Sequence, residues 1–260
     1  SDANLSHVSP SATAVKLTEQ GFKTTFRVVA RDDKQGAALA NFAAGPLKAK
    51  SVAVIDDRTP YGQGLADEFE KFAKEKGMKV VGREFTNDKA SDFNAILTKV
   101  RSMKPDVVMY GGMDATAGPM AKQMKALGMK STLLAGDGVC SPEFIKLAGN
   151  AADIMKCSNA GEAVEKLAKG ADFVAKYKKR FNTDVQVYSP YSYDAVFVIV
   201  EAMKKAGKAD RASITTALRD TNYDGLTGKI AFDAKGDIKD GAISMFEVKD
   251  GKLAYVSTVR

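Results

Sequence analysis

The middle of the chain alternates short apolar runs with longer segments of helical periodicity. In the longer segments, hydrophobic side chains recur every three or four residues, and a glycine or proline follows each of them. The short runs are rich in β-branched residues, which is typical of buried parallel strands. They cover residues 51–57, 78–85, 106–110 and 131–135. This order predicts an α/β fold with a parallel sheet and helices on both of its faces.

The last third of the chain has a different pattern. It predicts helices over 172–181, 191–206 and 213–219 and then short strands over 229–232, 243–248 and 253–259. The Asp250-Gly251 pair predicts a tight hairpin between the last two strands. Ser91 is expected to cap the helix that ends before Pro105. At 260 residues the chain could form one large domain or two smaller ones.

The chain carries 39 Lys and Arg against 32 Asp and Glu, a net charge of +7. Such a balance is compatible with a nucleic-acid or anionic-lipid partner. However, the basic residues lie at helical spacing among acids, and no aromatic platform interleaves with them. We therefore expect a solvated basic surface and no nucleic-acid partner.

Residues for catalysis or metal binding are scarce. The chain has one histidine, His7, in a polar segment without a nucleophile motif, so no Ser-His-Asp or Cys-His arrangement is predicted. Two cysteines and one distant histidine do not form a zinc motif. There is no phosphate-binding loop, and Gly62-Gln63-Gly64 lacks the third glycine of a dinucleotide-binding motif. We expect no catalytic residue, no metal and no cofactor, and keep a doubly wound α/β enzyme as the alternative.

Cys140 and Cys157 lie on either side of a predicted helix. They could remain two buried, reduced thiols. They could also form a disulfide, which would indicate an oxidising compartment. Closing a loop of this length would contribute about 3 kcal/mol in the chain-entropy model.

Polar residues gather in loops, several of them after strands. Asp137 stands between two glycines after the strand at 131–135, and Tyr61 begins the helix after the strand at 51–57. Small hydroxyl residues surround Pro10 in the segment 9–13. Hydroxyls and backbone amides suit a carboxylate and one acid suits an ammonium, so the set fits a zwitterion. Each residue also has a structural interpretation: a turn acid, a packing tyrosine and, for Thr13, a helix cap.

Several motifs in order along the chain closely resemble the periplasmic branched-chain amino-acid-binding proteins of ABC importers. They are SPSATAVKLTEQGFKTTFR, SVAVIDDRTPYGQGLADEF, DVVMYGG, AGDGVCSPEFIKLAG, VYSPYSYDAV and GKIAFDAKGD. The resemblance implies a type I periplasmic binding protein: two doubly wound α/β lobes, joined by three chain crossings, that close on a ligand held between them.

The resemblance also implies how the lobes divide. The first lobe would comprise 1–31 and 162–241, and the second 32–161 and 242–260. Family members carry about a hundred residues before the SPSATA motif, so the first lobe is expected to be incomplete here. Its long helix would then have little sheet to cover.

Site residues follow from the resemblance one at a time. Ser11, Ala12 and Thr13 match the clamp for the charged groups of the amino acid. Asp137 matches the acid that meets the ligand ammonium, where the best-known members have glutamate. The walls of the cleft would be Tyr61, Tyr188 and Met113, the last in place of a tyrosine. The cysteine pair resembles a variant within the family, which supports the disulfide.

The implied function is a non-enzymatic one. The protein would capture leucine, isoleucine or valine and deliver it to an ABC permease in the inner membrane. Relatives of the same fold bind an amide, urea or an aromatic acid, which is the main alternative. The implied location is the periplasm, for a secreted protein whose signal peptide is not in this chain.

Overall fold

The computed structural model of the chain describes residues 3–259. It divides into two units. The first comprises the described residues up to Arg31 together with Ala160–Ile243, and the second comprises Asp32–Asn159 and Ser244–Val259. The last two changes of unit lie two residues from the expected ones, so the second unit is two residues shorter at each of them. Asn159 and Ser244, the residues at these two limits, pair with each other in the sheet.

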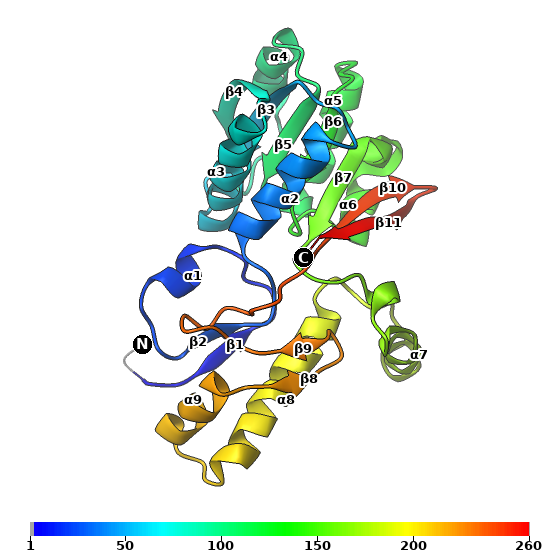
Figure 1. Cartoon of the computed structure of the whole chain (residues 1–260). Helices are drawn as coiled ribbons and strands as arrows, with labels where there is room; N and C mark the ends of the chain where they lie inside the picture. The colour runs from blue at the N-terminus through cyan, green and yellow to red at the C-terminus, as the bar shows by residue number, and fades with distance from the viewer. Residues whose placement is uncertain (1–2, 260) are drawn as a thin grey trace. The chain divides into compact units, whose positions relative to one another are not determined.

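The second unit is built on one seven-stranded sheet, in the order β11-β10-β7-β6-β5-β3-β4 (Figure 1). Five of its strands are parallel: β3 Ser51–Asp56, β4 Lys79–Phe85, β5 Val107–Gly111, β6 Thr132–Ala135 and β7 Met155–Asn159. Strand β10 (Ile243–Lys249) runs antiparallel to β7, and β11 (Lys252–Val259) pairs with β10. The predicted parallel sheet is therefore confirmed, with an antiparallel hairpin at one edge.

Helices connect these strands and cover the sheet. Helix α2 packs against α3 on one face, and α4, α5 and α6 contact one another in turn on the other (Figure 1). Their bounds are α2 Asp32–Ala44, α3 Pro60–Glu75, α4 Asn94–Ser102, α5 Asp114–Ala126 and α6 Pro142–Ala148, followed by a 3₁₀ helix at Gly149–Ile154. Because both faces are covered, the central strands β3, β5 and β6 are largely apolar, and Val52, Val54, Val107 and Val108 are all buried.

The chain order of the strands reverses at β3. From β3 the chain goes to β4 on one side of it, and then to β5 on the other. In sheets of this kind the loops at such a reversal diverge and leave a crevice at the carboxyl ends of the strands. Here α3 begins very close to β5: a Cβ at Gly62 would lie 2.5 Å from the carbonyl oxygen of Gly111. Only glycine allows this approach, which is the packing role of Gly62.

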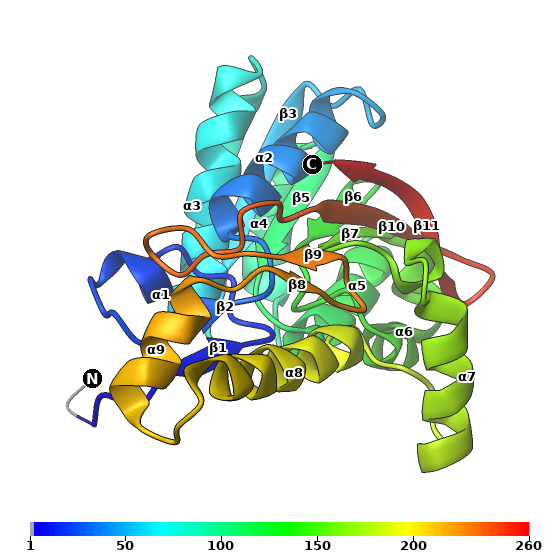
Figure 2. The same ribbon diagram turned by 60° about the horizontal axis from the view of Figure 1, so that its bottom comes forward.

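The first unit has only small sheets among its described residues (Figure 2). Strand β1 (His7–Ser9) pairs in parallel with β2 (Thr25–Arg27), and β8 (Tyr223–Asp224) pairs with β9 (Lys229–Ile230). Its helices are α1 Lys16–Glu19, α7 Gly170–Phe181, α8 Ser189–Ala206 and α9 Arg211–Arg219, with a short 3₁₀ helix at Val164–Lys166. Helix α8 contacts α9 and β1. No helix in the part of the chain described is both long and apolar enough to cross a membrane.

Some predicted elements differ from the structure. Ser91 does not cap α4; Phe93 precedes the helix, and the carboxylate of Asp92 accepts the backbone N–H of Asn94 at 2.9 Å. An acid next to the helix start therefore does what the serine was expected to do. The strand expected at 229–232 ends at Ile230. The hairpin is confirmed: Asp250 and Gly251 both have positive φ, as its tight turn requires.

Candidate functional site

Three loops of the second unit bring Tyr61, Met113 and Asp137 together at the carboxyl edge of the sheet. Each residue follows a different strand: β3, β5 and β6. The hydroxyl of Tyr61 donates to Oδ1 of Asp137 at 2.8 Å and accepts the backbone N–H of Gly138 at 3.0 Å. A Cβ at Gly138 would lie 2.7 Å from the sulfur of Met113. These three predicted residues therefore form one cluster.

The position of Tyr61 is set by the first turn of α3. Thr59 precedes the helix, and its hydroxyl accepts the backbone N–H of Gly62 at 2.9 Å. Pro60 occupies the first helical position, where the absent N–H is not needed. This start places the tyrosine one residue into the helix, with its hydroxyl at the loop after β6. Tyr61 is thus both a helix-entry residue and a partner of the acid.

The glycines on either side of Asp137 permit close packing. A Cβ at Gly136 would lie 2.3 Å from a methyl carbon of Leu65 and 2.8 Å from the hydroxyl of Tyr61. One at Gly138 would meet the carbonyl oxygen of Gly112 at 2.8 Å as well as Met113. Gly138 is therefore required by its close approach to the backbone of the β5 loop, and Gly136 leaves room for side chains of α3.

Three further residues belong to this site and were not predicted. Gln35 on α2 donates from Nε2 to Oδ1 of Asp137 at 2.9 Å and accepts its backbone N–H at 3.1 Å. Gln35 also contacts Asp32 and Ser158 through hydrogen bonds of 2.9 and 2.8 Å. Asp137 is only 3% exposed. No sequence signal distinguishes Gln35, because it directly follows three charged residues, 32–34, in the first turn of α2.

The disulfide between Cys140 and Cys157 is present in the structure. Cys140 lies in the turn after Asp137, and its backbone N–H donates to the carbonyl of Asp137 at 3.2 Å. Cys157 lies on β7, next to Ser158. The bond therefore joins the two segments that carry Asp137 and Ser158, and it spans 17 residues.

A second group of predicted residues lies in the first unit. Ser11, Ala12 and Thr13 form the loop after β1, and the hydroxyl of Ser9 accepts the N–H groups of Ser11 and Ala12 at 3.4 and 3.0 Å. Thr13 is 2% exposed, and its hydroxyl has no hydrogen-bond partner. A buried hydroxyl without a partner is costly, so this atom is a candidate for ligand contact.

A buried arginine holds this loop in place. The Nη1 atom of Arg27 donates to the carbonyls of Ala12 and Ala14, both at 3.0 Å, and its Nε lies 2.6 Å from a carboxylate oxygen of Asp237. The guanidinium is fully buried, which is tolerated because it is paired and hydrogen-bonded. Tyr188, in the same unit, is half-buried at the residue before α8.

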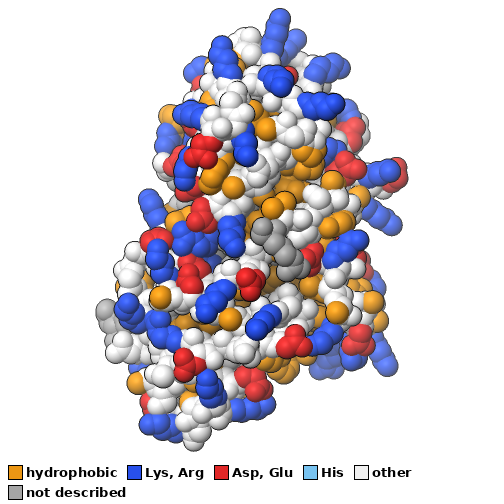
Figure 3. Space-filling model, in the orientation of Figure 1, with side chains coloured by type: hydrophobic (Ala, Val, Ile, Leu, Met, Phe, Trp, Pro, Cys, Tyr) orange, Lys and Arg blue, Asp and Glu red, His pale blue; other side chains and the backbone are white. Residues whose placement is uncertain are grey.

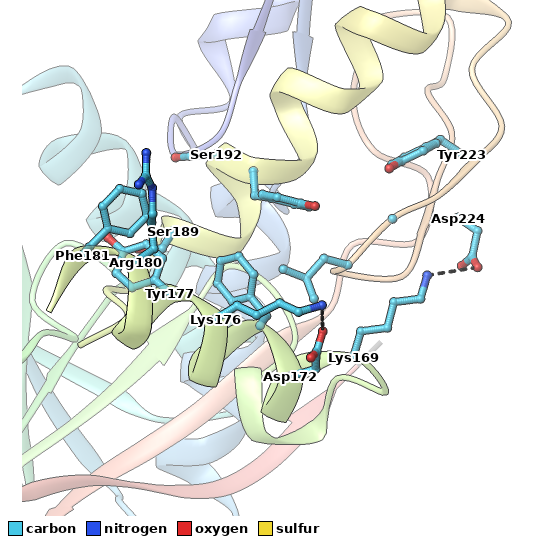
Figure 4. Close-up of a pocket in the computed structure, with 14 residues that line it drawn as sticks. Lys169, Asp172, Lys176, Tyr177, Arg180, Phe181, Ser189, Ser192, Tyr223 and Asp224 are labelled. Carbon is cyan, nitrogen blue, oxygen red and sulfur yellow. Dashed lines mark ion pairs between the residues drawn. The ribbon is translucent and has the colours of Figure 1, made fainter. Parts of the chain in front are cut away.

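The first unit also has a cavity of about 620 Å³ beside α7 and α8 (Figure 4). Aromatic and charged side chains together form its walls. Among the aromatic ones, Phe173 lies 5.5 Å from Tyr193 and 5.8 Å from Tyr177 between ring centres. Ion pairs at its rim join Lys176 to Asp172 at 2.7 Å and Lys169 to Asp224 at 3.5 Å. None of the predicted site residues lines this cavity. We therefore do not assign the ligand to it.

Lysines and arginines spread over the face seen in Figure 3, with acids among them. Burial raises the pKa of Tyr110, whose neutral hydroxyl shares a 2.7 Å hydrogen bond with Thr116 beneath the Met113 loop. Within residues 3–259, no three His, Cys, Asp or Glu side chains group in a way that could hold a metal ion.

Comparison with known proteins shows that this chain belongs to a protein family. The sequence profile of the periplasmic binding proteins matches residues 2–252. Leu/Ile/Val-binding protein homolog 1 of Brucella abortus is 34% identical over 254 residues, which cover 96% of this chain and 68% of the relative. A leucine-binding protein of Thermotoga maritima has a TM-score of 0.94 at 30% identity, covering 99% of this chain and 74% of that one. A branched-chain amino acid transporter substrate-binding protein of Streptococcus pneumoniae, solved with isoleucine, has a TM-score of 0.90 at 26% identity, covering 99% and 73%.

Proposed function

Because this chain belongs to the periplasmic binding protein family and has its type I fold, we propose that it is a solute-binding protein for leucine, isoleucine or valine. The protein would work outside the cytoplasm, where it would deliver the amino acid to an ABC permease in the membrane. The relatives with this similarity are named as binding proteins, which favours capture of a ligand over catalysis. The disulfide supports an oxidising compartment.

The observation that carries the proposal is the buried Asp137 carboxylate at the crevice of the sheet. The Tyr61 hydroxyl meets one of its oxygens, so its position is defined before any ligand arrives. A buried carboxylate binds an ammonium more strongly than an exposed one, because water does not screen the pair. We assign the ammonium of the amino acid to Asp137, and its aliphatic side chain to contact with Met113, whose thioether adapts to branched shapes.

For the carboxylate of the amino acid we propose the loop of Ser11, Ala12 and Thr13. The buried Thr13 hydroxyl supports this assignment, since a carboxylate oxygen would satisfy it. The N–H groups of Ser11 and Ala12 already donate to Ser9, so they would have to exchange that partner for the ligand. Tyr188 would supply an aromatic wall.

Calorimetric titration of this chain tests the proposal. The panel contains leucine, isoleucine and valine, with urea, an aliphatic amide and benzoate as competitors. Two leucine analogues test each charged group: 3-methylbutylamine lacks the carboxylate and 4-methylpentanoate lacks the ammonium. We expect the three amino acids to bind most tightly and each analogue to bind at least about tenfold more weakly, since a charge-assisted contact contributes about 1.5–3 kcal/mol.

The competitors decide between ligand classes. Tightest binding of urea, the amide or benzoate would show that the branched-chain assignment is wrong while a solute-binding role holds. Equal affinity for leucine and 4-methylpentanoate would remove the ammonium contact from the proposal.

A further inference from the structure

Gln35 contacts the loop after β6 from a position 102 residues earlier in the chain. Its side chain is fully buried. Nε2 donates to Oδ1 of Asp137 and to Oδ1 of Asp32, both at 2.9 Å. Oε1 accepts the backbone N–H of Asp137 at 3.1 Å and the hydroxyl of Ser158 at 2.8 Å.

These four contacts use the whole hydrogen-bonding capacity of a carboxamide. Such a group has two N–H donors and one oxygen with two lone pairs, and each has a partner here. A reversed amide would turn its oxygen toward two carboxylates and its NH₂ group toward two donors. The orientation of Gln35 is therefore determined by its surroundings.

The contacts reach Asp137 at two points, its main-chain N–H and its side-chain carboxylate. Holding both atoms fixes the loop and the side-chain rotamer together. Ser158 ties the same amide to β7, beside the cysteine that is bonded to Cys140. We propose that Gln35 is a positioning residue that presents the Asp137 carboxylate to the ligand ammonium. The inference rests on the proposed function, because it takes Asp137 as the ammonium acceptor.

The first test needs no ligand. Gln35→Met keeps a side chain of similar length but removes all four hydrogen bonds. We expect amide hydrogen exchange at Asp137 and Gly138, followed by NMR, to accelerate at least about tenfold in this variant. Ser131→Ala is the matched control: its buried hydroxyl donates to the carbonyl of Pro105 at 2.6 Å, at the other end of the strands. Exchange at both amides within twofold of the control would overturn the inference.

The second test separates positioning from general destabilisation. In Gln35→Met, we expect leucine affinity to fall at least about tenfold, while 4-methylpentanoate, which has no ammonium, changes less than twofold. Gln35→Glu, which keeps the volume and an acceptor but loses the donors to Asp137, should also weaken leucine binding. In Ser131→Ala both affinities should stay unchanged.

The possible results are distinct. Equal losses for leucine and 4-methylpentanoate would show that Gln35 only stabilises the fold. Accelerated exchange with unchanged leucine affinity would also overturn the positioning role. If the unaltered chain binds no amino acid, the proposed function is wrong, and the exchange measurement still decides whether Gln35 holds Asp137.

Discussion

At the scale of single residues, the candidate site depends on partners that fix one acid. Asp137 has a shorter reach than the glutamate expected from the best-known relatives. Tyr61 and Gln35 both donate to its Oδ1, so the short side chain is held by contacts from two helices. The flanking glycines let these contacts form. Asp137 supplies the negative charge, and its neighbours determine where that charge lies.

We predict that Asp137→Asn weakens leucine binding by about tenfold or more, because it removes a charge-assisted contact to an ammonium. The substitution preserves the shape of the side chain. Calorimetry on both proteins measures the change. Asp153→Asn is the control, since it removes the same charge at a largely exposed position of the second unit. An unchanged affinity in Asp137→Asn would exclude this residue from the site.

At the scale of elements, different polar contacts form at the two ends of the parallel strands. The carboxyl ends carry the cluster around Asp137, whereas the amino ends are joined by Asp106. The carboxylate of Asp106, at the start of β5, accepts the backbone N–H groups of Lys50 and Ser51 at 2.8 and 2.9 Å. It also accepts the Ser51 hydroxyl at 3.0 Å. This acid therefore aligns β3 with β5.

We predict a pH-dependent contribution of Asp106 to stability. The backbone N–H of Lys50, with the N–H and hydroxyl of Ser51, lowers the pKa of Asp106 below its usual 3.8. The stabilisation is therefore fully present above that usual value and is lost as the pH falls through the lower value of the folded state. Asp106→Asn should unfold at lower temperature at pH 7, by about 2–4 °C for a loss of about 1 kcal/mol.

Calorimetric melting of the Asp106→Asn variant and the unaltered chain at a series of pH values checks this prediction. The difference in Tm should shrink as the pH falls below about 4, because the unfolded state of the unaltered protein takes up its proton first, and it should be smallest below the lower pKa of the folded state. A difference that stays constant down to pH 2 would contradict it.

At the scale of the whole molecule, the two units differ in how well they cover their helices. The second unit covers both faces of its sheet. In the first unit, the described residues leave large apolar side chains of α7 and α8 exposed, most of all Phe181 at 61% and Val196 at 58%. We call this surface the α7–α8 face; its exposed members are Val174, Phe181, Tyr193, Val196, Phe197 and Met203. An apolar surface of this kind favours association.

We predict that this chain self-associates through the α7–α8 face. Size-exclusion chromatography with light scattering should give a mass above that of one chain, rising with concentration. Phe181→Lys combined with Val196→Lys should increase the monomer fraction, because both charges would be buried on association. Leu5→Lys, at another exposed apolar position of the first unit, is the control. A monodisperse monomer of the unaltered chain would refute the prediction.

Much of the second unit could be predicted from the sequence, because its signals are local. The spacing of apolar residues indicates strands and helices, and glycine and proline mark their ends. Both signals depend only on residues that are close together in the chain. The loops after β3, β5 and β6 followed from these strands, and Tyr61 and Asp137 were noted in them from the pattern alone, whereas Met113 was named only from the family resemblance. Strand β7 was missed because its sequence, MKCSN, has no apolar run, and it forms only through pairing with β6 and β10. Strands β1 and β2 were not predicted either, because each is only three residues long and has too few residues to show a pattern.

The sequence by itself determined strands β3 to β6, β10 and β11, the turn at Asp250-Gly251 and the residue types available for a zwitterion. The family, its fold and the cysteine pair were recognised from motifs. Only the tertiary structure decided the partners of Asp137, because the packing of α2 beside the strands brings Gln35 to it, and the order of the strands brings Ser158 to Gln35. A buried polar group needs a partner wherever it lies, but its own sequence does not say which distant residue supplies that partner. That choice depends on contacts between segments about a hundred residues apart.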